Sequence, residues 1–123
     1  MPSKTKQQIR PKTITLDAQD KILGRLATEI AVYLQGKHLA SYAPHIDFPQ
    51  EVKVSNVGGI KVTGKKEEQK MYWHHSGYPG GMYGRKYKDV FAKNPSWVLR
   101  NAVKGMLPKN RLQSPRLKRL IIK

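Results

Sequence analysis

The sequence predicts a single α/β domain in which helices pack in layers against a sheet. Within the first 60 residues, a strand pattern, a helix pattern and a second strand pattern follow one another, an order that favours a layered α/β fold over a helix bundle or a β-barrel. A length of 123 residues suits one domain with a modest core. The hydrophobic share of 38% argues against a chain that is disordered throughout.

The N-terminal part is predicted to hold an arm, a strand and a helix. Residues 1–12 are polar and basic and lack an apolar period, so we expect a flexible arm that orders on a partner. Residues 13–18 alternate polar and apolar side chains, which predicts the first strand of a domain that covers residues 13–123. From Lys21 the apolar residues recur at helical spacing, and Gly36 is expected to end that helix.

The connection to the second strand contains turn and loop signals. Asp17 and Asp20 are expected to supply turn and capping oxygens between the first strand and the helix. Pro44 marks a loop. Residues 51–57 alternate again and predict the second strand, and residues 60–63 are expected to continue as extended chain.

The second half is predicted to contain one more strand, one long helix and a tail. Residues 71–74 are rich in aromatic side chains, which favours a strand. Asn94 before Pro95 predicts a helix start, with Asn as the N-cap and Pro at the first helical position. The apolar stripe of residues 97–106 is expected to face the core. Residues 109–123 are predicted to form a basic C-terminal tail.

The charge of the chain points to a polyanionic partner. There are 24 Lys and Arg residues against 8 Asp and Glu, which gives a formal net charge of +16. Residues 61–123 hold 16 of the cations and only 3 of the anions, so the second half should form the basic face. A solvated face needs far less charge and normally mixes the signs, so nucleic acid is favoured over an anionic membrane or simple solubility.

The segment of residues 74–88 is the most informative part of the chain. It interleaves two histidines, three tyrosines and four glycines and ends in three cations. Such residues let backbone and planar rings lie against phosphates and exposed bases, whereas a protein core has little use for them. Tyr78, Tyr83 and Tyr87 are expected either to stack on bases or to pack locally.

An enzyme has little support. Residues 59–65 match the glycine and lysine positions of a phosphate-binding loop, but position 66 is Lys where a magnesium ligand would be Ser or Thr, and no apolar-periodic helix follows. The eight carboxylates are scattered, and caps and turns account for several of them. We therefore predict no catalytic residue and no small-molecule substrate.

No metal or other cofactor is predicted. The chain has no cysteine, and its four histidines have no carboxylate at the spacing of common zinc motifs. Adjacent His74 and His75 in a strand would point to opposite faces, so contacts with RNA suit these rings better. No apolar segment resembles a signal peptide or a membrane span, and we expect a cytoplasmic protein without a membrane partner.

Several segments, in order along the chain, resemble the universal large-subunit ribosomal protein thirteen family in its bacterial form. The two most specific are His-Ser-Gly-Tyr-Pro-Gly-Gly at 75–81 and Ala-Val-Lys-Gly-Met-Leu-Pro-Lys-Asn at 102–110. Shorter matches lie at 23–28, 36–38, 42–47 and 62–66. The resemblance implies a three-layer α/β/α fold around a small, mainly parallel sheet, no catalysis, and binding to large-subunit ribosomal RNA during early assembly.

The expected RNA-binding residues come from two sources. The resemblance implies contacts by the glycine-rich loop and by the end of the last long helix: His75, Ser76, Gly77, Tyr78, Gly80, Gly81, Lys104, Lys109 and Asn110. The charge clusters, the remaining histidines and the matching segments add further candidates: Arg25, Lys37, His38, Lys65, Lys66, Lys70, His74, Arg85, Lys86, Lys88, Arg111, Arg116, Lys118 and Arg119. Residues 113–115 depart from the family's usual glycine-basic turn, so no contact is assigned to them.

The predicted function is therefore that of a structural constituent of the large ribosomal subunit. Its partners would be large-subunit (23S-type) ribosomal RNA and neighbouring large-subunit ribosomal proteins. We expect Lys and Arg to contact phosphates, while the loop of residues 76–81 lets backbone amides approach the RNA closely. An RNA-binding regulator outside the ribosome is the alternative.

Overall fold

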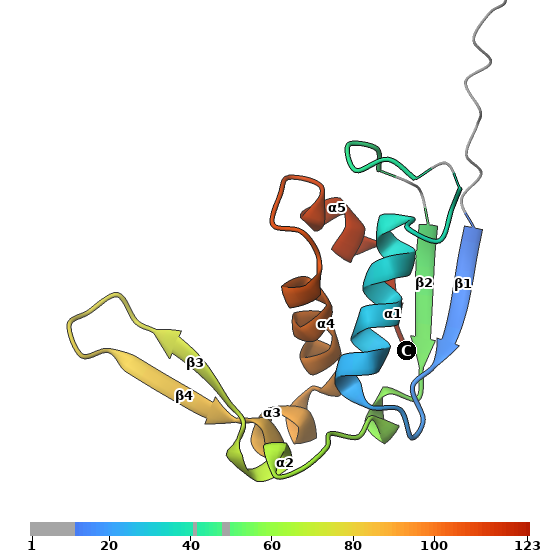
Figure 1. The fold of residues 1–123 in the computed structure, drawn as a ribbon. Coiled ribbons are helices and arrows are strands. Elements are labelled where there is room, and N and C mark those ends of the chain that lie inside the picture. Colours follow the sequence, from blue (N-terminus) through green and yellow to red (C-terminus); the bar gives the residue numbers. More distant parts are fainter. Residues whose placement is uncertain (1–11, 41, 48–49) are drawn as a thin grey trace, which may run out of the picture.

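Three parallel strands form the sheet of this protein. The computed structural model describes residues 12–40, 42–47 and 50–123, and the strand order is β1-β2-β5 (Figure 1). In register, Ile14 lies opposite Val52, and Val52 lies opposite Leu120. The strands are β1 Lys12–Asp17, β2 Gln50–Ser55 and β5 Leu120–Ile122. The α/β class and the mainly parallel sheet are as predicted.

The helices lie between the strands along the chain, and an antiparallel hairpin interrupts them. The helical elements are α1 Leu23–Gln35, the 3-10 turn η1 Val57–Gly59, α2 Lys66–Gln69, α3 Tyr87–Lys93, α4 Pro95–Met106 and α5 Gln113–Lys118. The hairpin consists of β3 Met71–His75 and β4 Met82–Lys86. Figure 1 shows this hairpin projecting from the base of α3 and α4, away from the sheet.

The core lies between α1, α4 and one face of the sheet. Val52 and Val54 alternate with partly exposed residues along β2, so that their side chains point to the same face. The residues of α1 and α4 that face them are fully or almost fully buried: Leu26, Ile30, Leu34, Val98, Leu99 and Val103. These side chains recur at intervals of three and four residues, which is why the sequence predicts both helices correctly.

The helices cover a single face of the sheet. Both connections between parallel strands move in the same direction across the sheet, from β1 to β2 and from β2 to β5, and right-handed crossovers then place their helices on one side. The other face carries Thr13, Thr15 and Lys53, and no helix packs on it within the described residues. The described residues thus form two of the three layers that the resemblance implies.

The C-terminal end of α1 follows from local chemistry, whereas its start does not carry the predicted cap. Gly36 adopts a φ of 77°, and its N–H donates to the Tyr33 carbonyl at 3.1 Å, which ends the helix as predicted. Asp17 supplies the expected turn oxygen, because its Oδ1 accepts from the Gln19 N–H at 3.0 Å. The capping role expected of Asp20 is wrong: no side chain caps α1, and Asp20 instead pairs with Lys61 at 2.9 Å.

Two further expectations need correction, and a third is confirmed. The extended chain expected at residues 60–63 is present at Ile60, and Lys61 makes an isolated parallel bridge to Ile22. Lys12, the last residue of the expected arm, is the first residue of β1; residues 1–11 lie outside the described part of the chain. Residues 109–123 are not a tail, because they form α5 and then β5, whose Leu120 is 2% exposed.

Replacing Asn94 with alanine is expected to lower the free energy of unfolding by about 1 kcal/mol. The Asn94 Oδ1 accepts from the Trp97 N–H at 3.2 Å and caps α4, as the sequence predicts. Urea denaturation would measure the loss. Asn101→Ala is the matched control, because Asn101 is exposed inside the same helix and alanine is the better helix former there. Equal losses in the two variants would contradict the capping role.

Candidate nucleic-acid interface

The loop at the tip of the hairpin has a defined backbone. The Ser76 N–H donates to the Gly81 carbonyl at 3.0 Å, and the Gly81 N–H donates to the Tyr78 carbonyl at 2.9 Å. The His75 Nδ1 accepts from the Gly77 N–H at 2.9 Å. Gly77 and Gly80 have φ values of 89° and 71°, which side chains other than glycine rarely adopt. The glycines of the motif thus shape a turn that holds Tyr78, 76% exposed, at the tip.

Gly81 is required for a second reason. A Cβ at Gly81 would collide with the Ser76 side chain and would lie 2.9 Å from the Tyr78 carbonyl oxygen. Any larger residue would therefore open the loop. The sequence shows only that these residues are glycines. The structure shows that Gly77 and Gly80 are needed for their positive φ, whereas Gly81 is needed because a side chain would not fit.

The two faces of the hairpin differ in character. Residues directly opposite each other in an antiparallel pair point to the same side, and so do residues two apart on one strand. Met82 lies opposite His75, so Trp73 and Met82 share one face, while His74 and Tyr83 share the other. Trp73 and Met82 are more than half exposed. On the other face the His74 and Tyr83 rings are 5.6 Å apart, and Tyr72 meets Trp97 of α4 edge to face at 5.0 Å. This second face of the hairpin is directed toward the helices.

The expected cations of the hairpin region are exposed and free of carboxylate partners. Among the described residues, ion pairs join Lys61 to Asp20 and join Arg116 and Arg119 to Asp47. No cation of the hairpin, α2 or α3 takes part in them. The exposed cations predicted here are Lys65, Lys66, Arg85, Lys86 and Lys88. Their positive charge is therefore available to an external anion.

A groove between α1 and α4 brings together cations that are distant in sequence. Arg25 of α1 lies with Lys66 and Lys70 along a cleft of about 620 Å³, which Gly24 and Gly105 also line. A Cβ at either glycine would meet nothing within 4 Å, so the floor of the groove is open. The sequence names these cations separately, and the tertiary fold makes them neighbours.

A second groove lies at the end of α4 and shares Gly105 with the first. Lys104, Lys109 and Asn110, to which the resemblance assigns RNA contacts, line this cleft of about 540 Å³. The Gln113 Nε2 donates to the Lys104 carbonyl at 2.8 Å, which anchors α5 against the end of α4. Asn101 also lines the groove and was not predicted, although its spacing of three from Lys104 places it on the same helix face.

Two predicted contact residues lie inside the fold instead. Arg116 is 2% exposed, with its Nε 3.6 Å from the Asp47 carboxylate, and Arg119 forms a two-point ion pair with the same carboxylate at 2.7 and 2.8 Å. Both guanidinium groups hold α5 to the loop before β2, so we remove them from the RNA-binding set. Tyr87 is likewise 3% exposed and stacks on Phe91 at 5.6 Å, which resolves its expected role as local packing.

The remaining predicted residues are exposed but lie apart from these clusters. Lys37 and His38 follow the end of α1, where the His38 ring meets Tyr33 edge to face at 5.1 Å. Arg111 and Lys118 lie before and at the end of α5. The predicted residues of the hairpin and of α4 lie together on defined surfaces. Lys37, His38, Arg111 and Lys118 line neither of the two grooves described above.

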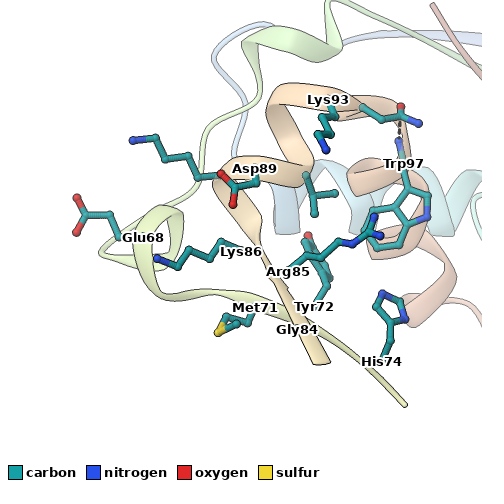
Figure 2. Close-up of a pocket in the computed structure, with 13 residues that line it drawn as sticks. Glu68, Met71, Tyr72, His74, Gly84, Arg85, Lys86, Asp89, Lys93 and Trp97 are labelled. Atoms are coloured by element: carbon teal, nitrogen blue, oxygen red, sulfur yellow. Dashed lines mark hydrogen bonds between the residues drawn. The ribbon is translucent and has the colours of Figure 1, made fainter. Parts of the chain in front are cut away.

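Trp97 joins the site in a way that the sequence did not predict. It belongs to the apolar stripe of α4 and packs against the core, yet it also lines a cavity with Tyr72 and Arg85 (Figure 2). Burial raises the pKa of Tyr72 to about 12, with a smaller contribution from neighbouring Tyr87. A tyrosine hydroxyl is protonated at physiological pH even at its ordinary pKa, and the raised pKa keeps that of Tyr72 protonated in alkaline solution as well.

Two classes of site are not found in the described part of the chain. No group of three or more His, Asp or Glu side chains is placed to hold a metal ion in residues 12–40, 42–47 and 50–123. None of the helices in the same ranges is long and apolar enough to cross a membrane.

Comparison with known proteins supports the resemblance. A sequence model of the family described as ribosomal protein L13 matches residues 11–122. Large ribosomal subunit protein uL13 of Dechloromonas aromatica (strain RCB) is 51% identical over 113 residues, which are 92% of this chain and 80% of that protein. The protein of the same name from Rubrobacter xylanophilus is 46% identical over 94% of this chain and 80% of its own length. The chain belongs to the ribosomal protein L13 family.

Proposed function

We propose that this protein is a non-enzymatic, structural constituent of the large ribosomal subunit that binds large-subunit ribosomal RNA. Its place would then be the cytoplasm, on ribosomes, and neighbouring large-subunit proteins would be further partners. Membership of the L13 family and the names of the relatives support the ribosomal assignment. The single observation that carries RNA binding is the set of exposed cations on the hairpin, α3 and α4, none of which has a carboxylate partner among the described residues.

The arrangement of these cations suits a structured RNA. The hairpin extends from the domain (Figure 1). The grooves beside α1 and α4 lie on the body of the domain. Phosphate contacts from both regions would fix the protein in one orientation on the RNA. The exposed Tyr78 at the loop tip, and the backbone amides around it, would approach the RNA most closely.

The direct test is the affinity for large-subunit ribosomal RNA against a scrambled RNA of equal length across a salt series. Selective binding with a log-log salt slope of about −5 or steeper would support the proposal, because each neutralised phosphate contributes a slope of about −0.7 on single strands. Equal affinity for both RNAs would leave a non-selective polycation and would contradict the ribosomal role. Selective binding to another RNA would favour the regulator.

Neutralising three cations of the hairpin region is expected to make the salt slope shallower by about 2. The variant is Arg85→Gln, Lys86→Gln and Lys88→Gln, and all three positions are exposed, so the fold should be kept. The matched control replaces Lys21, Lys53 and Lys61 with Gln. This control removes equal charge from the region of the sheet, where Lys61 already pairs with Asp20. If both triple variants had the same salt slope, RNA binding would depend on the net charge of the protein and not on a defined surface at the hairpin.

A further inference from the structure

A cavity at the base of the hairpin adds to the surfaces described so far. We call it the hairpin cavity, and its volume is about 1020 Å³, at the upper end of the range of small-molecule sites. Four structural elements line it: the inner face of the hairpin, α2, α3 and the start of α4 (Figure 2). The residues that matter here are Tyr72, His74, Arg85, Lys86, Asp89 and Trp97.

One end of the cavity is aromatic. The Tyr72 and Trp97 rings meet edge to face, with their centroids 5.0 Å apart and their planes at 85°. Both are partly buried at the margin of the core, and each still lines the cavity. Figure 2 shows the Arg85 side chain extending toward the Trp97 indole, with His74 nearby. A planar guanidinium beside aromatic rings is a surface on which a flat, electron-rich ring can stack.

The other end of the cavity is charged. Lys86 and Asp89 lie there with Glu68, on the opposite side of the cavity from Trp97 (Figure 2). Among the described residues, none of these groups forms an ion pair, although both signs are present. Lysines at this end can take a phosphate, while the carboxylates can accept hydrogen bonds from amino groups.

We propose that the hairpin cavity takes one unpaired nucleotide of the bound RNA, with its base against Tyr72, Trp97 and Arg85 and its phosphate at the lysine end. This inference rests on the proposed RNA binding. The two ends match the two parts of a nucleotide, a planar base and an anionic phosphate, and the base must leave a helix to enter. A free nucleotide shares this chemistry. An RNA strand, however, would also engage the exposed cations of the grooves, which a free nucleotide cannot reach.

The first test uses the fluorescence of Trp97. Replacing the exposed Trp73 with Phe leaves Trp97 as the single tryptophan, and the probes are a 12-nucleotide oligocytidine strand and an RNA duplex of the same length. Saturable quenching of Trp97 by the single strand but not by the duplex would support the proposal, because only unstacked bases can reach the ring. If both RNAs bind and neither quenches, the cavity is empty in the complex and the proposal fails while RNA binding stands. If neither RNA binds, the nucleotide site fails, and the affinity for large-subunit ribosomal RNA described above tests the proposed function separately.

The second test keeps the charge and removes the planar group. Arg85→Lys is expected to weaken single-strand binding by about fivefold or more and to leave duplex binding unchanged, because base stacking contributes to the first alone. Lys21→Arg, at an exposed lysine outside the cavity and the grooves, is the control and should change neither affinity much. Equal weakening of both RNAs by Arg85→Lys would assign Arg85 to phosphate contact and would overturn the nucleotide site.

A third arm separates the two sources of the nucleotide. Cytidine 5′-monophosphate is titrated into the Trp73→Phe variant, with the oligocytidine strand as competitor. Quenching by the strand at concentrations far below those needed for the free nucleotide would support an RNA site. Quenching by the free nucleotide that the strand cannot displace would show a separate nucleotide site and would overturn the proposal.

Discussion

Replacing Asp47 with alanine is expected to lower the free energy of unfolding by about 3 kcal/mol, the low end of the cost of leaving a buried charge without its partner. Asp47 lies in the loop before β2 and is the carboxylate that both Arg116 and Arg119 approach. Arg116 is 2% exposed, and its Nε has no hydrogen-bond partner among the described residues. Its charge is compensated by Asp47, whose carboxylate lies 3.6 Å from that Nε. Removing Asp47 leaves that guanidinium unpaired in the core.

The hydrogen bonds of Arg119 give a second reason to expect that Asp47→Ala lowers the free energy of unfolding. Its guanidinium donates to both Asp47 oxygens, to the Gln50 carbonyl at 3.1 Å and to the Leu34 carbonyl at 3.3 Å. These contacts tie the last turn before β5 to the start of β2 and to the end of α1. Removing Asp47 is therefore expected to weaken the packing of these three segments, which are distant from one another in the sequence.

Urea denaturation measures the loss of unfolding free energy in Asp47→Ala, and two further variants test its cause. Asp20→Ala breaks the exposed pair with Lys61, and exposed pairs contribute about 0 to 1 kcal/mol, so its loss should be small. Adding Arg116→Met to Asp47→Ala should recover part of the stability, because the unpaired cation is removed. Similar losses for Asp47→Ala and Asp20→Ala would contradict the role of the buried charge.

The same pair makes stability depend on pH in the acid range. The hydrogen bonds from Arg119 have the largest effect and lower the pKa of Asp47; burial, the second effect, raises it, and the charges of Arg119 and Arg116 lower it further. A carboxyl with a lowered pKa in the folded state stabilises the fold above its unfolded value, near 3.9, and loses that contribution as the pH falls through the folded value. The difference in stability between wild type and Asp47→Ala should therefore shrink below about pH 4.

Replacing Leu120 with alanine is expected to lower the free energy of unfolding by about 3 kcal/mol, within the range for a buried leucine. Leu120 begins β5, pairs with Val52 of the central strand and is 2% exposed. If residues 109–123 were a solvated tail, this substitution would cost almost nothing. The measurement therefore separates the tail predicted from the sequence from the strand that the structure contains.

Ile121→Ala is the matched control for this prediction. Ile121 follows Leu120 directly, and alternation along the strand turns its side chain to the outer face of the sheet, where it is partly exposed. Its loss should be clearly smaller than that of Leu120. Equal losses at both positions would contradict the alternation and with it the assignment of β5, whereas unchanged stability in both would mean that the segment is a tail after all.

Local signals were sufficient where an element is long or carries its own cap. The 3.6-residue period of α1, its glycine stop at Gly36 and the Asn94 cap of α4 all act within a few residues along the chain, so the sequence predicts them correctly. Short elements have no such signal. β5 contains three residues, and its strand character comes from pairing with β2, which is about 70 residues earlier.

The candidate site divides in the same way. Residue type and clustering pointed to the glycine-rich loop and to the cations as candidate contacts, whereas the family resemblance implied the contacts at the end of α4. The sequence could not separate Arg85, which is exposed beside Trp97, from Arg116, which is buried beside Asp47. Both are arginines among other cations, and only the tertiary contact with a distant carboxylate or ring decides their roles.

By itself, the sequence determined the α/β class, the charge and therefore the kind of partner, and the segments that mark the L13 family. These properties depend on composition and on short-range patterns, which folding does not alter. The tertiary structure alone decided that the C-terminal segment completes the sheet, that Arg25 lies with Lys66 and Lys70 in one groove, and that the hairpin and α4 enclose a cavity. Each of these joins residues far apart in the chain, and their proximity arises from packing rather than from any local pattern.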